Sequence, residues 1–204
     1  MDKISEKRIE RLSMYRRRLL IQSVNKDYIY SHELADAANS NAARVRRDLM
    51  KLGYTGIPKK GYRIVDLIDH ISDFLDPDQT KNVIIVGAGN LGHALLNFFK
   101  GRRSKLCLVA AFDKDLSKIG KDIGGVICYH IDEMPDKIKE LNVSIGVIST
   151  VETATAQVSE IMMDSGIRSI INFTCYPFIP REGVFVEQVD ITAAFEKAAF
   201  FTKE

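Results

Sequence analysis

The sequence predicts a two-domain α/β protein, in which a small basic helical domain precedes a parallel β-sheet domain. The chain has 204 residues, which suits two modest domains. Its charge is uneven, because residues 1–63 hold 15 Lys and Arg against 7 Asp and Glu, whereas the remainder holds 14 against 20. The hydrophobic pattern also changes after Lys81, from helical spacing to short apolar runs. The basic N-terminal part suggests a polyanionic partner.

The N-terminal part has the spacing of helices joined by tight turns. Residues 5–24 place apolar side chains three and four positions apart, which predicts an amphipathic helix. Ser31 is expected to cap a short second helix, and Asn39 suits a left-handed turn after it. Asn41 can cap a third, basic helix that extends to about Leu52.

Glycines and a proline between residues 53 and 61 end the helical pattern and predict a hairpin-like basic loop. A further helix is expected from Ile64 to Leu75. The polar stretch after it contains Pro77, which restricts the residue before it. The predicted organisation is a first domain over residues 1–75, a linker over 76–80, a second domain over 81–188 and a C-terminal segment over 189–204.

This order of elements matches a winged helix-turn-helix, whose second helix enters the major groove of DNA. Arg44, Arg47 and Lys51 are three or four residues apart, so they share one helical face. Arginine can bond guanine bidentately, and lysines of the loop would neutralise phosphates. The alternative is a solvated basic face without a ligand. The predicted DNA contacts are Asn41, Arg44, Arg46, Arg47, Lys51, Lys59, Lys60 and Arg63.

The second domain has near-continuous apolar runs separated by helical segments, a pattern typical of a parallel sheet with helices on both faces. The last segment, from Ile191 to Phe201, puts apolar side chains on one face of a helix and therefore requires a docking surface. The expected strands cover residues 83–86, 106–112, 126–129, 145–149, 169–173 and 184–186.

A glycine-rich turn over residues 87–92 connects the first strand with a predicted helix over 91–99. This is the context that the Rossmann dinucleotide fingerprint requires. Gly87 permits the tight turn, Gly89 lets the backbone approach a pyrophosphate, and Gly92 lets the helix pack on the sheet. The N-terminus of the helix would face the phosphates.

An acidic residue completes this pattern, because Asp113 ends the second strand 21 residues after Gly92. Its carboxylate can accept from the adenosine ribose 2′-hydroxyl and would repel a 2′-phosphate, which favours NAD(H) over NADP(H). The alternatives are a turn without a ligand and a site for another nucleotide such as coenzyme A. Later strand ends should lie near the nicotinamide. The predicted contacts are Gly87, Ala88, Gly89, Asn90, Leu91, Gly92, Asp113, Lys114, Thr150, Val151 and Phe173.

The remaining features argue against an enzyme. Nicotinamide enzymes usually add a region that holds the substrate and a proton-transfer group. Few residues follow the sixth predicted strand, and none of them is His or Cys. The four histidines show no catalytic spacing. An oxidoreductase with a small helical substrate domain stays the alternative.

The three cysteines, Cys107, Cys128 and Cys175, are widely spaced and predict neither a disulfide framework nor a metal site. The N-terminus lacks the apolar core of a signal peptide. No apolar run reaches the ~20 residues that a membrane span needs. A cytoplasmic protein is therefore expected.

Several motifs, taken as a set, make the chain resemble the Rex family of redox-sensing transcriptional repressors over nearly its whole length. They occur in both predicted domains and in the C-terminal segment. They are Lys3-Ile4-Ser5 with Arg11-Leu12, Arg46 to Leu49, Val86 to Asn97, Ala110 to Asp113, Tyr129 to Glu133, and Ile171 to Phe173 with Val189 to Thr192.

The resemblance implies a homodimer with two winged helices on a palindromic operator and with the C-terminal helix of each protomer swapped into the other. It implies that NADH releases the DNA, whereas NAD+ competes for the site without doing so. Arg17 and Asp190 match positions whose pairing across protomers is linked to this switch. Phe98, where the family usually has Tyr, and Phe173 are expected walls of the nicotinamide site. The expected function is a repressor that senses the NADH/NAD+ ratio.

Overall fold

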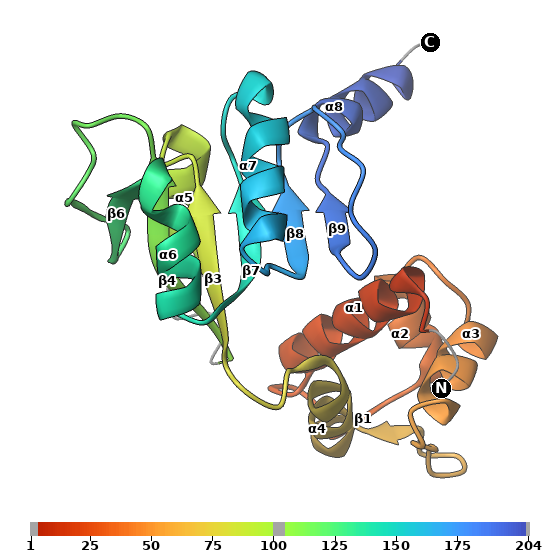
Figure 1. The fold of residues 1–204 in the computed structure, drawn as a ribbon. Helices are drawn as coiled ribbons and strands as arrows, with labels where there is room; N and C mark the ends of the chain where they lie inside the picture. The colour runs from red at the N-terminus through yellow and green to blue at the C-terminus, as the bar shows by residue number, and fades with distance from the viewer. Residues whose placement is uncertain (1–3, 100–104, 203–204) are drawn as a thin grey trace. The chain divides into compact units, whose positions relative to one another are not determined.

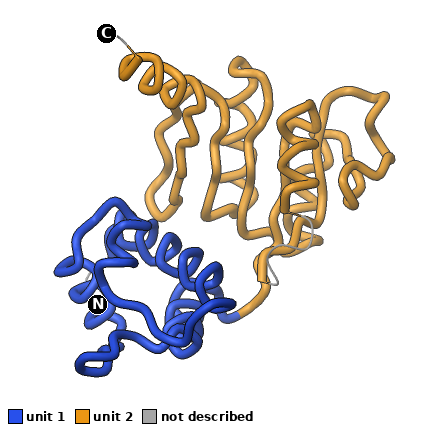
Figure 2. Tube along the Cα trace, turned by 180° about the vertical axis from the view of Figure 1, so that it is seen from behind, with its two compact units in different colours: residues 1–78 blue, residues 79–204 orange. Residues whose placement is uncertain are grey.

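The structure, a computed structural model, describes residues 4–99 and 105–202. The chain divides into two compact units, residues 1–78 and 79–204, which Figure 2 shows in different colours. Each unit has its own hydrophobic core. Three parts of the predictions lie outside the described residues: Lys3 of the N-terminal motif, residues 100–104 of the second domain and residues 203–204 of the C-terminal segment.

The described part of the first unit is mainly helical (Figure 1). Leu12 and Leu19 of the first helix share a fully buried core with Leu67 and Ile71 of the fourth. Burying a side chain of this size contributes about 1.5–3 kcal/mol. The elements are α1 (Glu6–Gln22), β1 (Tyr28–Ile29), α2 (Ser31–Ala37), α3 (Ala42–Met50), β2 (Tyr62–Arg63) and α4 (Ile64–Leu75).

The turn between α2 and α3 forms as predicted. Asn39 has a φ of 45°, in the left-handed region that Asn tolerates. Asn41 is the N-cap of α3, and its side chain accepts a hydrogen bond from the backbone N–H of Arg44 at 2.9 Å. The two helices therefore follow each other with the short connection that a helix-turn-helix needs.

The predicted N-cap of α2 is wrong by one residue. Tyr30 is the N-cap, and Ser31 is the first helical residue. The side chain of Glu33, in the first turn, accepts a hydrogen bond from the backbone N–H of Tyr30 at 2.9 Å. The N-terminus of α2 is therefore capped by Glu33 and not by the Ser31 hydroxyl. The Ser31 hydroxyl instead accepts from Arg46 Nη1 at 3.1 Å and links α2 to α3.

The described strands of the second unit form one sheet with the order β5-β6-β4-β3-β7-β8-β9. Neighbouring strands are parallel, except that β5 is antiparallel to β6. The strands are β3 (Lys81–Val86), β4 (Leu106–Asp113), β5 (Asp122–Ile123), β6 (Val126–His130), β7 (Val143–Ile148), β8 (Ser169–Asn172) and β9 (Phe185–Gln188).

Helices cover this sheet on both faces. Alternate residues of the central strand β3 accordingly pack into two different cores. Ile84 and Val86 share a core with side chains of α6 and α7, which lie in front of the sheet in Figure 1. Val83 and Ile85 share another core with Leu96 of α5, behind it. The helices are α5 (Asn90–Phe99), α6 (Met134–Glu140), which follows the short 3-10 turn η1 (Ile131–Glu133), and α7 (Glu152–Asp164).

All six predicted runs fall on strands, but β5 was not predicted. It has only two residues and forms a hairpin with β6 through Gly124 and Gly125, which have φ of 66° and 98°. So short an edge strand shows no recognisable alternation in the sequence. The last strand is also shifted, since β9 ends at Gln188 rather than at residue 186.

The end of the second unit has two unusual features. The connection from β8 to β9, residues 173–184, contains no helix. The following helix, α8 (Ile191–Phe200), has no buried residue in the described chain, and Phe195 is 73% exposed. Within its own chain, α8 is therefore held mainly through its first residues.

Among the described residues, no helix has both the length and the apolar character needed to cross a bilayer. Nor does that part of the chain contain a group of three His, Cys, Asp or Glu side chains that could hold a metal ion. The three cysteines are free thiols, with Cys128 buried and Cys107 and Cys175 exposed.

Candidate nucleotide and DNA sites

The glycines of the turn after β3 each meet a different steric demand. Gly87 has a φ of 97°, and a Cβ there would lie 2.5 Å from the carbonyl oxygen of Ser149. A Cβ on Gly92 would lie only 2.0 Å from the carbonyl oxygen of Gly87. A Cβ on Gly89 would meet nothing within 4 Å, so this position opens into free space. The first and last glycines shape the turn, and Gly89 leaves room for a ligand.

A cleft of about 440 Å³ lies at the carboxyl ends of the strands, beside this turn. Its volume falls within the range of about 300–1,000 Å³ typical of small-molecule sites. The cleft brings together six of the predicted contacts: Gly87, Gly89, Asp113, Lys114, Thr150 and Val151. The lining residues that sequence reasoning missed include Asp115, Lys118, Ile131, Ser149 and Ala154.

Asp113, at the end of β4, is fixed by three hydrogen bonds. Its Oδ2 accepts from the backbone N–H of Ala88 at 2.9 Å and from Lys118 Nζ at 2.8 Å, and its Oδ1 accepts from the N–H of Asp115 at 3.0 Å. Burial raises the pKa of Asp113, but these bonds, led by that from Lys118, outweigh it, so the pKa lies below its usual value. The carboxylate is therefore ionised and oriented toward the glycine-rich turn.

Thr150 provides an independent sign that the cleft accepts a polar ligand. Its Oγ1 is buried and has no hydrogen-bond partner among the described residues. A buried hydroxyl without a partner costs about 1–3 kcal/mol, which a ligand group could recover. The open Gly89, the oriented Asp113 and the unpaired Thr150 hydroxyl together fit a dinucleotide with hydroxyl and phosphate groups.

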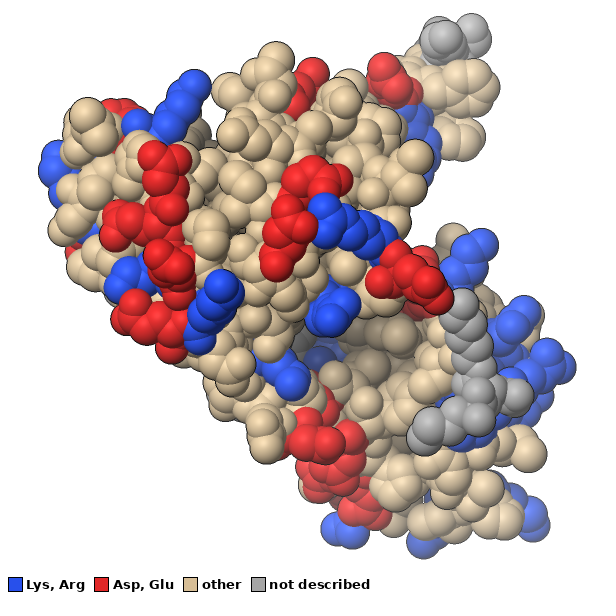
Figure 3. All heavy atoms as spheres, viewed as in Figure 1, with Lys and Arg blue, Asp and Glu red and all other residues tan. Residues whose placement is uncertain are grey.

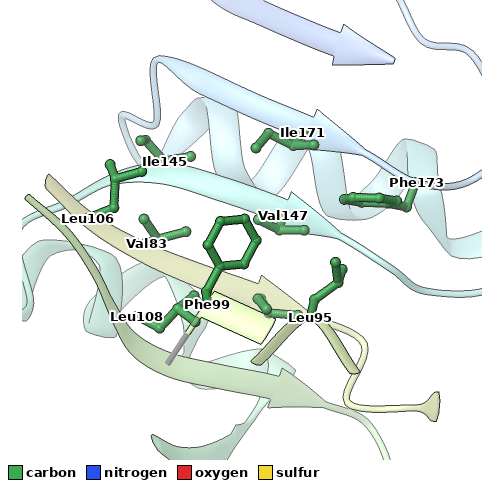
Figure 4. Close-up of a pocket in the computed structure, with 10 residues that line it drawn as sticks. Val83, Leu95, Phe99, Leu106, Leu108, Ile145, Val147, Ile171 and Phe173 are labelled. Carbon is green, nitrogen blue, oxygen red and sulfur yellow. The ribbon is translucent and has the colours of Figure 1, made fainter. Parts of the chain in front are cut away.

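The other predicted nucleotide contacts lie outside the cleft lining. Asn90 and Leu91 form the first turn of α5 beside it. Phe98 is 53% exposed on α5. Phe173 lines a separate apolar pocket of about 90 Å³ on the α5 face of the sheet, into which Figure 4 shows the ring of Phe99 directed. The single chain therefore does not bring the two predicted aromatic walls to the cleft.

The candidate DNA surface is the outer face of α3. Arg44, Arg47 and Lys51 are exposed, while the opposite face buries Val45 and Leu49. Figure 3 shows Lys and Arg side chains gathered over the edge of the first unit where α3 lies. Arg46 is also exposed, with one guanidinium nitrogen held by Ser31, as described above.

The loop between α3 and β2, called the wing here (residues 53–62), is a tight hairpin. Ile57 and Gly61 exchange backbone hydrogen bonds of 2.7 and 3.0 Å. Lys59 lies at its tip with a φ of 64°, and Lys60 Nζ lies 5.9 Å from the centre of the Tyr28 ring. Lys59 and Lys60 of the wing are exposed, as is Arg63 on β2, so all three predicted DNA contacts of this region can reach solvent.

The buried side of α3 is attached to α1 through Asp48. Arg11 Nε donates to Asp48 Oδ2 at 2.7 Å and Arg11 Nη2 donates to Oδ1 at 2.9 Å. The Tyr15 hydroxyl donates to Oδ2 at 3.2 Å. Burial and the nearby Asp48 carboxylate raise the pKa of Tyr15 to about 12. The sequence did not predict the contacts of Arg11 and Tyr15 with Asp48, because pairs 37 and 33 residues apart leave no local pattern.

The two predicted switch residues lie in different units. Arg17 is exposed on α1. Asp190 is the N-cap of α8, and its Oδ1 accepts from the N–H of Ala193 at 2.8 Å. The carboxylate therefore fixes the first turn of α8 within its own chain.

Comparison with known families gives matches in both units. Residues 78–176 match the family described as "CoA binding domain", and residues 3–49 match "Putative DNA-binding protein N-terminus". The redox-sensing transcriptional repressor Rex of Rubrobacter xylanophilus is 35% identical over 176 residues, covering 86% of this chain and 82% of the relative. Rex of Thermosipho africanus is 34% identical over 201 residues, covering 97% and 95%.

Solved structures agree with these matches. A Rex-family repressor, RSP, in complex with β-NAD+ and operator DNA has a TM-score of 0.90 at 27% identity and covers 98% of this chain and 93% of its own. The same repressor in complex with β-NADH has a TM-score of 0.87 at 26% identity, covering 98% and 95%. The relatives are named as repressors, so the chain groups with transcriptional regulators rather than enzymes. With this similarity over almost the whole chain in both sequence and fold, the protein belongs to the Rex family of redox-sensing transcriptional repressors.

Proposed function

We propose that this protein is a cytoplasmic homodimeric repressor that binds operator DNA when NADH is scarce and releases it when NADH binds. One observation carries the proposal: a single chain combines an exposed basic α3 and wing with a dinucleotide cleft that has an oriented carboxylate at the end of β4. The complexes of the related repressor with NADH, and with NAD+ and operator DNA, support it. In this proposal residues 1–75 bind DNA, 76–80 link the domains, 81–188 bind the nucleotide and 189–204 form the swapped segment.

The proposed nucleotide is NAD(H) rather than NADP(H). Asp113 would accept from the adenosine ribose 2′-hydroxyl, and its negative charge would oppose a 2′-phosphate. Gly89 and the N-terminus of α5 would face the pyrophosphate. The Thr150 hydroxyl and Val151 also line the cleft, and we assign them to the nicotinamide half of the ligand. The bound nucleotide would act through its charge and shape alone, because a regulatory ligand does not have to react.

The proposed sensor must bind the neutral reduced ring and the cationic oxidised ring with different consequences for DNA. A ligand that has equal affinity for the DNA-bound and released states would shift nothing. We assign this discrimination to Phe98, Phe173 and the partner's C-terminal helix, which would complete the nicotinamide end in the dimer. The exposed apolar side chains of α8, among them Ile191 and Phe195, favour such an exchange of helices. Arg17 would pair with Asp190 across protomers in one of the two states.

The proposal is tested by measuring DNA binding as a function of nucleotide. A DNA duplex is first selected by the purified protein from a random library without nucleotide. That duplex is then titrated with protein alone, with NADH and with NAD+. NADH should weaken binding by at least about tenfold, within the usual range of allosteric coupling, and NAD+ should not. The Gly89→Trp variant, whose side chain fills the cleft, should bind the duplex without responding to NADH.

Two outcomes would overturn the proposal. One is that no duplex is selected even at low salt, where phosphate contacts are strongest, which would leave a nucleotide-binding module without a DNA partner. The other is that both nucleotides bind, measured by calorimetry, but neither changes affinity for the duplex. In that case the cleft would not be the input of a switch.

A further inference from the structure

A chain of buried hydrogen bonds begins beside the nucleotide cleft. Thr155 lies in the first turn of α7, next to the cleft-lining Ala154. Its Oγ1 donates to Thr174 Oγ1 at 2.9 Å, and Thr174 Oγ1 donates to Asn172 Oδ1 at 2.9 Å. Thr155 and Asn172 are completely buried, and Thr174 is 5% exposed. The turn that borders the cleft is thereby attached to the end of β8.

The same chain continues to the start of α8. Asn172 Nδ2 donates to Gln188 Oε1 at 2.8 Å, and Gln188 Nε2 donates to the carbonyl oxygen of Thr174 at 2.6 Å. The backbone N–H of Val189 donates to the carbonyl oxygen of Asn172 at 2.9 Å. Asp190, the N-cap of α8, comes directly after Val189. The network therefore ends at the residues from which α8 emerges.

Every hydrogen-bonding position of the Asn172 amide is occupied. Its Oδ1 also accepts from the N–H of Thr174 at 3.0 Å, and its Nδ2 also donates to the carbonyl oxygen of Tyr176 at 2.9 Å. A fully satisfied buried network is rigid, and removal of one member leaves the others unpaired. It consequently links the N-terminal part of α7 to the strand end and the start of α8.

The direction of α8 depends on this attachment. Each described residue of the helix is exposed, so few contacts with its own unit fix it. One further contact reaches α8: Cys175 Sγ lies 3.4 Å from Thr192 Oγ1. Cys175 directly follows Thr174, so this contact begins beside the network. A small displacement at the root of a helix is magnified along its length, because an α-helix of ten residues extends about 15 Å.

We propose that Thr155, Thr174, Asn172 and Gln188 are positioning residues that transmit nucleotide binding in the cleft to the orientation of α8. The inference rests on the proposed function, since it requires NADH in the cleft to change the affinity for DNA. A nucleotide that contacts Val151, the N-cap of α7, acts on the helix turn that contains Thr155. The network, buried at Thr155 and Asn172 and exposed at Gln188, passes that displacement to the start of α8.

The test separates nucleotide affinity from its effect on DNA. The measured quantity is the coupling ratio, defined as affinity for the selected duplex without NADH divided by affinity with saturating NADH. Thr155→Val keeps the shape of the side chain but removes its hydroxyl. Its coupling ratio should fall roughly fivefold or more, the scale of one lost buried hydrogen bond. The NADH dissociation constant without DNA should stay within about twofold, because Thr155 does not line the cleft.

Two controls distinguish coupling from general damage to α7. Thr155→Ser keeps a hydroxyl and should restore the wild-type coupling ratio. Ser159→Ala removes another buried hydroxyl of α7, one that donates to the carbonyl oxygen of Ala156 in the same helix, and should leave the ratio unchanged. If thermal melting shows that Thr155→Val is unfolded, Gln188→Leu, at the exposed end of the network, is measured in the same way.

The outcomes separate this inference from the function on which it rests. A coupling ratio of one for the wild type overturns the proposed function and the inference with it. A wild-type response that the folded Thr155→Val or Gln188→Leu variant retains in full overturns the inference alone. A loss of coupling in Ser159→Ala equal to that in Thr155→Val also overturns it, because the effect would then belong to α7 in general.

Discussion

Arg11 holds both carboxylate oxygens of Asp48, through Nε at 2.7 Å and Nη2 at 2.9 Å. The side chain of Asp48 is 4% exposed and that of Arg11 17%, so this ion pair is shielded from water. Bidentate pairing also fixes the relative angle of the two groups. The pair thus helps to set how α3, the proposed DNA-contacting helix, lies on α1.

Replacement of Asp48 should destabilise the first unit. In Asp48→Asn, the Arg11 charge stays partly buried without its counter-charge, and breaking such a pair costs about 3–5 kcal/mol when fully buried. We expect about 2–3 kcal/mol here, measured by urea unfolding, together with weaker duplex binding. Asp66→Asn breaks the exposed Arg63–Asp66 pair and should change stability by less than about 1 kcal/mol. Equal effects of the two variants would contradict the role given to Asp48.

The Tyr15 hydroxyl should make stability depend on alkaline pH. The pKa of Tyr15 is raised to about 12, from 10.0, by burial and by the Asp48 carboxylate. A raised native pKa contributes stability that is complete below pH 10 and is lost as the pH rises toward 12. The stability difference between wild type and Tyr15→Phe should therefore shrink over this window. Unfolding curves recorded between pH 8 and 12 check this, and parallel pH profiles would refute it.

Basic residues of α3 and of the wing should affect DNA binding differently. Arg47→Ala should weaken binding by about 1–3 kcal/mol and relax selectivity at one base pair, as expected for the loss of a contact with a base. Lys59→Asn retains a residue that tolerates the left-handed backbone. It should weaken binding to all sequences and reduce the salt slope by about 0.9, as expected for one lost phosphate contact. Lys139→Ala, on the exposed surface of α6, serves as a charge-matched control and should leave both quantities unchanged.

The Asp113 carboxylate should exclude the 2′-phosphate of NADP(H). Wild-type protein should bind NADPH at least about tenfold more weakly than NADH, because close like charges cost several kcal/mol. Asp113→Asn should narrow this ratio, measured by fluorescence titration with both nucleotides. Asp115→Asn removes the same charge from another residue of the cleft and should preserve the ratio. A similar narrowing in both variants would mean that net charge, rather than the position of Asp113, excludes NADPH.

The parts of the nucleotide site that depend on residues close together in the sequence could be predicted. The steric roles of Gly87 and Gly92 and the place of Asp113 at a strand end all follow from motif and spacing. The ion-pair partner of Asp113 could not be predicted in this way. Lys118 follows five residues later in an irregular segment, and its contact depends on how that segment folds back over the cleft.

The direction of a single side chain could not be predicted from its place along the chain. Phe173 comes directly after β8, as expected, yet it lines the apolar pocket on the α5 face rather than the cleft (Figure 4). Successive residues of an extended chain point to opposite faces, so position along the chain alone cannot place a side chain. The network around Asn172 could not be predicted either, since the bonds that join its segments connect residues 14 to 19 positions apart.

The hydrogen bond from the Ala88 N–H to Asp113 has a consequence for the speed of response. It joins the glycine-rich turn to the end of β4 through groups of this chain alone, so no nucleotide group is needed to hold the backbone of the site there. Binding to such a site does not wait for a loop to become ordered. In the proposed repressor, the delay between a rise in NADH and the start of transcription would then be governed by nucleotide diffusion and by how long the protein stays on its operator.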